Sequence, residues 1–146
     1  DRLALIRGLA DGTIDFVVSD HSPQARENKE LEIDFASYGM TALETAVPLM
    51  LDLVANGSLG AKRFVEAMAT KPRDVFGIKG GRIKAGEKAA LTVIDPSLER
   101  VISLENIVSK SKNSPFLGKR LKGFPVLTIF SGRITYQAER ESKKSR

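Results

Sequence analysis

One short run of the chain, from Ile14 to Val18, restricts its possible folds more than any other segment. The run is rich in β-branched and aromatic residues and stops abruptly at the polar residues Ser19 and Asp20. Such a run is typical of a strand buried in a parallel sheet. Before it, residues 2–10 place apolar side chains near one helical face and end at Asp11-Gly12, as a helix closed by glycine does. The sequence therefore predicts a helix followed by a buried strand over 14–20.

A long loop and a helix are predicted next. Residues 22–37 are polar and charged without clear periodicity, and loops of this length are uncommon unless they serve a site. Thr41 and Glu44 have the spacing of a capping box, in which both side chains satisfy free amides at a helix start. This helix should end near Asn56-Gly57, and Pro48 should kink it or shift its start.

Two shorter helices and a change of period complete the first half. Ser58 precedes a second helix, and a third should have Thr70 as its N-cap, Pro72 in its first turn and Gly77 at its end. From about residue 78 the apolar pattern becomes strand-like. Residues 1–76 are therefore expected to be α/β.

The second half predicts part of a small β domain over residues 77–140. Residues 91–94 form a strand that Asp95-Pro96 should end, and residues 126–130 and 134–136 flank Ser131-Gly132 as a terminal hairpin. Residues 141–146 are expected to be a charged tail.

Composition limits the chemistry of the chain. Its 146 residues include one histidine and no cysteine. Disulfides and thiolate metal sites are excluded, and a catalytic zinc site, which usually takes three protein ligands, cannot be assembled by this chain alone. The formal charge of +5 lies partly in Lys143, Lys144 and Arg146. A solvated tail is favoured over a nucleic-acid site because no stacking aromatic residues accompany these basic residues.

The sequence also predicts a cytoplasmic protein. The longest apolar stretch, residues 46–55, is broken by Pro48 and Asp52 and is too short to cross a bilayer. The start of the chain shows no apolar segment typical of a signal peptide.

Asp20 is the leading candidate for a functional residue. A carboxylate at the C-terminal end of a parallel strand is where α/β barrels place catalytic groups. Residue spacing alone allows the alternative that Asp20 caps a turn and that His21 is solvated. Successive strand residues point to opposite faces, so Asp20 and His21 are not expected to bind the same metal ion.

The sequence resembles the C-terminal portion of class I dihydroorotases, members of the amidohydrolase superfamily and relatives of allantoinase and dihydropyrimidinase. Four segments carry the resemblance: residues 11–23 with Asp-His-x-Pro, residues 38–49 with Tyr38-Gly39, residues 71–96, and residues 109–118 with the later Thr128-Ile129 and Gly132. The third segment is shared across the superfamily. The second and the fourth favour dihydroorotase over its relatives.

The resemblance implies a zinc enzyme with two metal ions per active site. It would interconvert dihydroorotate and N-carbamoyl-aspartate in pyrimidine synthesis. Asp20 matches an aspartate on the eighth barrel strand that binds metal and acts as general base and acid. Tyr38 and Gly39 match a backbone position that contacts the pyrimidine ring.

One departure concerns substrate binding. The family usually has a histidine at the fourth position after the aspartate, where it contacts the substrate carboxylate, and this chain has Gln24. Glutamine donates a hydrogen bond but carries no positive charge, so carboxylate binding should weaken unless Arg26 or Lys29 compensates. The segment Ser19 to Pro23 also occurs in allantoinase-like sequences, which keeps an allantoinase- or dihydropyrimidinase-type activity as an alternative.

The other departure is the lack of the family's remaining site residues. Its His-x-His pair, carboxylated lysine, two further metal histidines and substrate arginine have no match in this chain. A TIM barrel needs about 250 residues. We therefore expect the last strand and terminal helices of a barrel plus the C-terminal part of a small β sandwich, inactive alone. The alternative is a non-catalytic scaffold partner of aspartate transcarbamoylase. A homo-oligomer is compatible with either interpretation.

Overall fold

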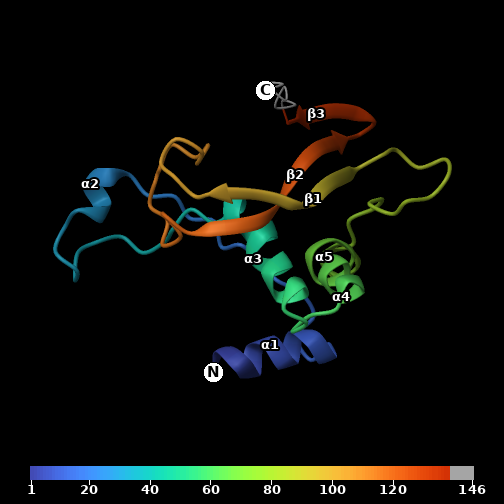
Figure 1. Ribbon diagram of the computed structural model, residues 1–146, viewed down its shortest axis with the longest axis horizontal. Coiled ribbons are helices and arrows are strands. Elements are labelled where there is room, and N and C mark those ends of the chain that lie inside the picture. Colours follow the sequence, from blue (N-terminus) through green and yellow to red (C-terminus); the bar gives the residue numbers. More distant parts are fainter. Residues whose placement is uncertain (139–146) are drawn as a thin grey trace, which may run out of the picture.

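The computed structural model describes residues 1–138 (Figure 1). The predicted charged tail, residues 141–146, and the last two residues of the predicted β domain lie outside the described residues. The helices are α1 (Arg2–Asp11), α2 (Arg26–Lys29), α3 (Leu43–Ala55), α4 (Ala61–Val65), the π-helical turn η1 (Glu66–Thr70) and α5 (Lys71–Phe76). The strands are β1 (Leu91–Val101), β2 (Arg120–Phe130) and β3 (Arg133–Gln137).

The predicted first helix is confirmed, whereas the predicted strand after it is not formed. Helix α1 ends at Gly12, whose φ of 89° is left-handed. Residues 15–20 belong to no strand of the described chain, and the isolated parallel bridge between His21 and Met40 begins only after them. The prediction over 14–20 was wrong for this chain because a strand requires hydrogen-bonded neighbours, and apolar composition alone supplies none.

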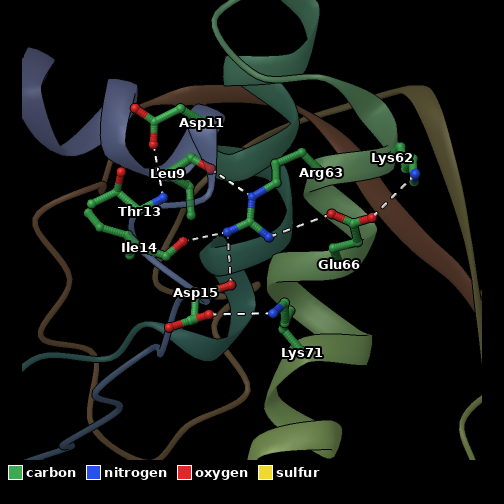
Figure 2. A network of polar contacts seen from close by, with 9 residues as sticks. All are labelled: Leu9, Asp11, Thr13, Ile14, Asp15, Lys62, Arg63, Glu66 and Lys71. Carbon is green, nitrogen blue, oxygen red and sulfur yellow. Dashed lines mark hydrogen bonds and ion pairs between the residues drawn. The ribbon is translucent and has the colours of Figure 1, made fainter.

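Arg63 holds α1 and the extended segment against α4 (Figure 2). Its Nε donates to the carbonyl of Leu9 at 2.7 Å, and its terminal nitrogen donates to the carbonyls of Ile14 and Asp15. The Leu9 carbonyl belongs to the last turn of α1, where backbone acceptors lack partners within the helix. One largely buried guanidinium therefore caps a helix and fixes the segment that leads toward Asp20.

The helix beginning at Leu43 is confirmed, but the capping box is wrong. Helix α3 runs through the buried Pro48 to Ala55. The Thr41 hydroxyl donates to the carbonyl of Asn113, and a Glu44 carboxylate oxygen accepts from the amides of Val108 and Ser109. Both side chains thus bind backbone groups of a distant loop. They do not bind the amides at the start of α3, which the spacing favours.

The next two predicted helices form one continuous helical stretch. Thr70 has helical backbone angles and makes no side-chain cap, because η1 joins α4 directly to α5. The predicted N-cap at Thr70 was therefore wrong. Pro72 does lie in the first turn of α5, and Gly77 closes that helix with a left-handed φ of 66°.

The strands form an antiparallel sheet in the order β1-β2-β3. The predicted hairpin is confirmed, with Ser131 and Gly132 both at positive φ in the two-residue turn. Asp95-Pro96 does not end β1, contrary to the prediction. A register shift between Asp95 and Glu99 accommodates the proline, and Ser97 donates from its amide and hydroxyl to the Asp95 carboxylate.

Two apolar clusters make up the core, and residues of α3 contact both. The first gathers Leu9, Met50, Leu59, Phe64 and Ala67, and the second gathers Ile102, Ile107, Leu121 and Phe124. Leu49 packs against the second cluster, while Ile94 of β1 packs against the first. Gly123 lets β2 approach α3, since a Cβ there would collide with Leu51. Within residues 1–138 no helix is long and apolar enough to span a membrane.

Candidate active site

Asp20 lies at the end of the extended segment with an exposed side chain. Its φ of 44° falls in the left-handed region, which is uncommon for any residue other than glycine. Such backbone angles cluster at functional sites, where the surrounding structure enforces them. The carboxylate makes no hydrogen bond or ion pair within the described part of the chain, so it is free to act on a bound molecule.

His21 fixes the position of Asp20 by capping α3. Its Nδ1 accepts hydrogen bonds from the amides of Ala42 and Leu43 at 3.0 and 3.2 Å. These are free donors of the first turn, and a neutral imidazole with its proton on Nε2 can accept them. The alternative that His21 is a solvated side chain is therefore wrong, and its imidazole is half-buried.

Gly39 lies directly against Ser22, two residues from Asp20. The Ser22 amide donates to the carbonyl of Met40 at 3.0 Å. Gly39 has a φ of 114°, and a Cβ at this position would stand 2.5 Å from the carbonyl oxygen of Ser22. Only glycine fits this backbone and this contact. The structure thus brings the segment that follows Asp20 against Gly39, while the roles of Asp20, Tyr38 and Gly39 in a site stay predictions.

The carbonyl of Gly39 accepts hydrogen bonds from two side chains that are remote in sequence. Lys29 Nζ donates to it at 3.1 Å and to the Ser37 carbonyl at 2.6 Å. Asn113 Nδ2 donates to the same Gly39 oxygen at 2.9 Å. Lys29 was predicted only as a possible compensating charge for the substrate carboxylate, and Asn113 was not predicted as part of the site. Asn113 lies in the fourth segment of family resemblance, which was the only available signal for it.

The remaining predicted site residues are spread around this contact. Gln24 donates from Nε2 to the Ser22 hydroxyl at 3.3 Å, so its amide is held next to Gly39. The Tyr38 side chain is 94% exposed and makes no hydrogen bond within residues 1–138. Arg26 is paired with Glu30 at 2.5 Å on an exposed surface. Of the two proposed compensating cations, Lys29 is therefore the one that lies at Gly39.

An open cleft of about 840 Å³ lies beside these residues. It is lined by the segment from Pro23 to Glu30 and by the loop from Ser109 to Asn113. The Lys112 ammonium is bonded to the carbonyl of Ile107. Lys110 projects from the same loop and makes no bond to another described residue.

Glu44 joins α3 to the loop that carries Asn113. Burial raises the pKa of the Glu44 carboxyl, but the amide of Ser109, its own amide, the nearby His21 and the amide of Val108 together lower it more. The net pKa lies below the ordinary value of 4.5, so Glu44 is a carboxylate at neutral pH. Its charge stabilises two loop amides that would otherwise lack partners.

The described residues do not complete a metal site. Within residues 1–138 no three His, Cys, Asp or Glu side chains lie where they could hold one metal ion together. Asp20 can supply at most one ligand, and the imidazole of His21 is directed into the start of α3. The ligand set that a zinc ion requires is thus not provided by these residues.

The chain belongs to the amidohydrolase family, whose model matches residues 1–135. It is 44% identical over 141 residues to a dihydroorotase from Bacillus subtilis (strain 168), covering 96% of this chain and 33% of that protein. It is 42% identical over 142 residues to a dihydroorotase from Geobacillus sp. (strain WCH70), again covering 33% of the relative. The chain therefore spans about a third of the length of these relatives.

Solved structures of hydantoinases share the fold of this chain. An L-hydantoinase (dihydropyrimidinase) from Arthrobacter aurescens matches with a TM-score of 0.84 and 34% identity, covering 91% of this chain and 31% of that one. A D-hydantoinase (dihydropyrimidinase) from Thermus sp. matches with a TM-score of 0.87 and 31% identity, covering 94% and 31%. The sequence-based assignment to the amidohydrolases is thereby confirmed.

Proposed function

We propose that the protein containing this chain is a metal-dependent cyclic amide hydrolase that interconverts dihydroorotate and N-carbamoyl-aspartate. Identity above 40% to proteins named dihydroorotase extends over nearly the whole chain, whereas the hydantoinase structures are 34% and 31% identical. The contact of Gly39 with Ser22, two residues after the unpaired carboxylate of Asp20, carries the proposal. A small-molecule substrate and a place in cytoplasmic pyrimidine synthesis follow from it.

Asp20 transfers the proton in this proposal. Ring opening requires that a water oxygen bond to the amide carbon while the carbon–nitrogen bond breaks. The Asp20 carboxylate accepts the proton of the attacking water and returns it to the departing nitrogen. The carboxylate is exposed and makes no hydrogen bond or ion pair within residues 1–138, so its oxygens are open to a water and to the substrate nitrogen.

The backbone near Gly39 and the Gln24 amide hold the substrate. The amides of Tyr38 and Gly39 donate no hydrogen bond within residues 1–138, so they are open to the ring's polar atoms. Gln24 supplies a neutral donor for the substrate carboxylate. Because the described residues do not complete a metal site, the two zinc ions expected from the family would need ligands from the rest of the protein.

The placement of the chain within that protein is also a proposal. Residues 1–76 would provide the last strand and terminal helices of a (β/α)8 barrel, and residues 77–140 part of a small β sandwich. The extended backbone of residues 15–20, which pairs with no strand within residues 1–138, supports this, since parallel strands on either side would convert it into a strand. A boundary at residue 76 agrees with the end of α5 at Phe76.

The test is an assay of the whole protein with zinc and dihydroorotate. Asp20→Ala should lower kcat by about a thousandfold or more, because a general base and acid contributes roughly 10² to 10⁴ in rate. Asp34→Ala removes an exposed carboxylate of the following loop and should leave the rate unchanged. Turnover by Asp20→Ala at the normal rate would refute the role of Asp20.

A hydantoinase-type activity is the second candidate, and the similarity to the hydantoinase structures favours it. Hydantoin and dihydrouracil lack the carboxylate of dihydroorotate. Comparison of kcat/KM for the three substrates separates the candidates, since a dihydroorotase should prefer the carboxylated ring. If none is hydrolysed while the protein sediments with aspartate transcarbamoylase, the scaffold alternative replaces both.

A further inference from the structure

Lys29 and Asn113 converge on the backbone on both sides of the Gly39 amide. Lys29 reaches across its own loop to the carbonyls of Ser37 and Gly39, at 2.6 and 3.1 Å. Asn113 arrives from a loop 74 positions further along the chain and donates to the Gly39 carbonyl at 2.9 Å. Two donors on one carbonyl oxygen use both of its lone pairs.

These bonds fix two peptide planes. In a trans peptide the N–H points away from the C=O. The Ser37 carbonyl accepts a hydrogen bond from Lys29. The Tyr38 amide, which belongs to the same peptide plane, therefore points away from Lys29. With the Gly39 carbonyl held by both side chains, the plane after Gly39 is fixed as well. The Gly39 amide lies between these two planes, and its residue is pressed against Ser22.

The partner loop is itself anchored. The carbonyl of Asn113 accepts from the Thr41 amide at 2.8 Å and from the Thr41 hydroxyl at 3.1 Å. Thr41 is 2% exposed, and Glu44 holds the amides of Val108 and Ser109 in the same loop. Asn113 is therefore a fixed donor on a rigid support and does not follow the motion of Gly39.

We propose that Lys29 and Asn113 are positioning residues that orient the Tyr38 and Gly39 amides toward the substrate ring. This inference rests on the proposed function, because it names what sets the geometry of that site. Neither residue needs to touch the substrate. Their contribution is that the two free amides are aligned before binding, so that the binding step does not have to order them.

The test compares Lys29→Met and Asn113→Leu in the whole protein, both of which keep side-chain size and remove the donor. Each should raise KM by about tenfold, the effect of losing one hydrogen-bonded contact, with kcat within about threefold of the original. KM is the sensitive quantity because the amides contact the ring equally in the ground and transition states. The double variant should show less than the product of the single effects, since both residues hold one carbonyl.

Two controls separate positioning from loss of charge or fold. Lys84→Met removes an equal charge from an exposed side chain outside the cleft and should leave KM and kcat unchanged. Lys29→Arg keeps a cationic donor and should restore KM to within about threefold of the original value. An unchanged KM in both Lys29→Met and Asn113→Leu, or a KM effect of equal size in Lys84→Met, would overturn the proposal.

Hydrogen exchange tests the same inference without substrate. The Ser37 and Thr41 amides are bonded to the carbonyls of Asn28 and Asn113 and flank the fixed planes. Exchange in the peptide spanning residues 37–41 should speed up several-fold in Lys29→Met and Asn113→Leu, and stay unchanged in Lys84→Met. If the original protein hydrolyses none of the cyclic amides, the proposed function fails, while this measurement still decides whether the two side chains fix Gly39. Unaltered exchange in both variants would refute the fixation itself.

Discussion

At the scale of single residues, the left-handed backbone of Asp20 lowers the stability of the fold, while its carboxylate serves the proposed function. A left-handed φ costs an ordinary residue roughly 1–2 kcal/mol, and glycine avoids this cost. Aspartate is tolerated there better than most residues, yet glycine would be the less strained choice. The presence of a carboxylate at a position that favours glycine fits a residue retained for its chemistry.

Asp20→Gly should therefore be inactive while folding at least as stably as the original protein. Thermal unfolding of the whole protein should give an equal or slightly higher Tm, since relief of strain is partly offset by the greater entropy of unfolded glycine. Activity should be lost together with the carboxylate. A clear fall in Tm would contradict the view that the backbone of Asp20 is strained.

His21 gives a second prediction at this scale. His21→Ala leaves the amides of Ala42 and Leu43 without their acceptor and should destabilise the protein by about 1 kcal/mol, the usual effect of losing an N-cap. His21→Asn retains a side-chain acceptor and should recover part of that loss. Denaturant unfolding measures both, and equal stability of His21→Ala and the original would show that the imidazole does not cap α3.

Local signals in the sequence led to single residues whose roles in the site stay predictions. Asp20 follows an apolar run directly, and Gly39 adjoins Tyr38 in a short motif. Lys29 was considered only as a source of charge, and the role of Asn113 depends on a contact with a residue 74 positions away. Glu44 shows the limit most clearly, because its spacing from Thr41 suits a local cap, whereas the folded chain offers it two amides of a distant loop.

At the scale of elements, one guanidinium connects α1, the extended segment and α4 (Figure 2). Arg63→Ala would leave the carbonyls of Leu9, Ile14 and Asp15 without that donor. We expect a loss of about 2–4 kcal/mol, since bonds to a charged donor are individually worth more than neutral ones. The shift of the denaturant midpoint measures it.

Lys62→Ala is the matched control for Arg63. Its ammonium is 91% exposed and lies 3.8 Å from Glu66, a pair that surface solvation makes weak. The free energy of unfolding should change by less than about 0.5 kcal/mol. Equal effects of the two substitutions would mean that Arg63 acts only through its surface pair with Glu66.

The lowered pKa of Glu44 predicts that the stability of the protein depends on pH. This carboxylate joins α3 to residues 106–113. Its pKa is lowered in the folded protein, so its stabilising contribution is fully present above pH 4.5 and is lost as the pH falls below that value. Glu44→Gln should be less stable than the original at pH 7, and the difference should shrink as the pH falls through this range. Urea unfolding at several pH values tests this, with the exposed Glu32→Gln as control. A difference that does not change with pH would contradict the ionic role of Glu44.

Element boundaries were predictable wherever glycine or a turn signal ended them. Gly12 and Gly77 close helices with positive φ, and Ser131-Gly132 forms the hairpin turn. The run over 14–20 failed for a different reason, because pairing partners determine whether an apolar segment becomes a strand. Asp95-Pro96 failed because a register shift lets a strand continue past a proline.

At the scale of the whole molecule, the described chain exposes apolar side chains that a self-sufficient domain would cover. Ile33 and Val108 are 89% and 88% exposed, and Val18 of the extended segment is 70% exposed. Further strands beside residues 15–20, as in the proposed barrel, would cover Val18. The chain spans about a third of the length of the two dihydroorotases to which it is similar.

The 146-residue chain alone should therefore hydrolyse no dihydroorotate, even with excess zinc. Its described residues offer Asp20 as a proton acceptor but no set of three ligands for a metal ion, and a carboxylate alone does not activate water sufficiently. The whole protein, assayed under the same conditions, should be active, and Asp20→Ala should abolish that activity. Because exposed apolar side chains favour association, sedimentation should show the isolated chain self-associating more than the whole protein does. Measurable turnover by the isolated chain would require a metal site built from two copies, which titration of activity against chain concentration would reveal as a second-order dependence.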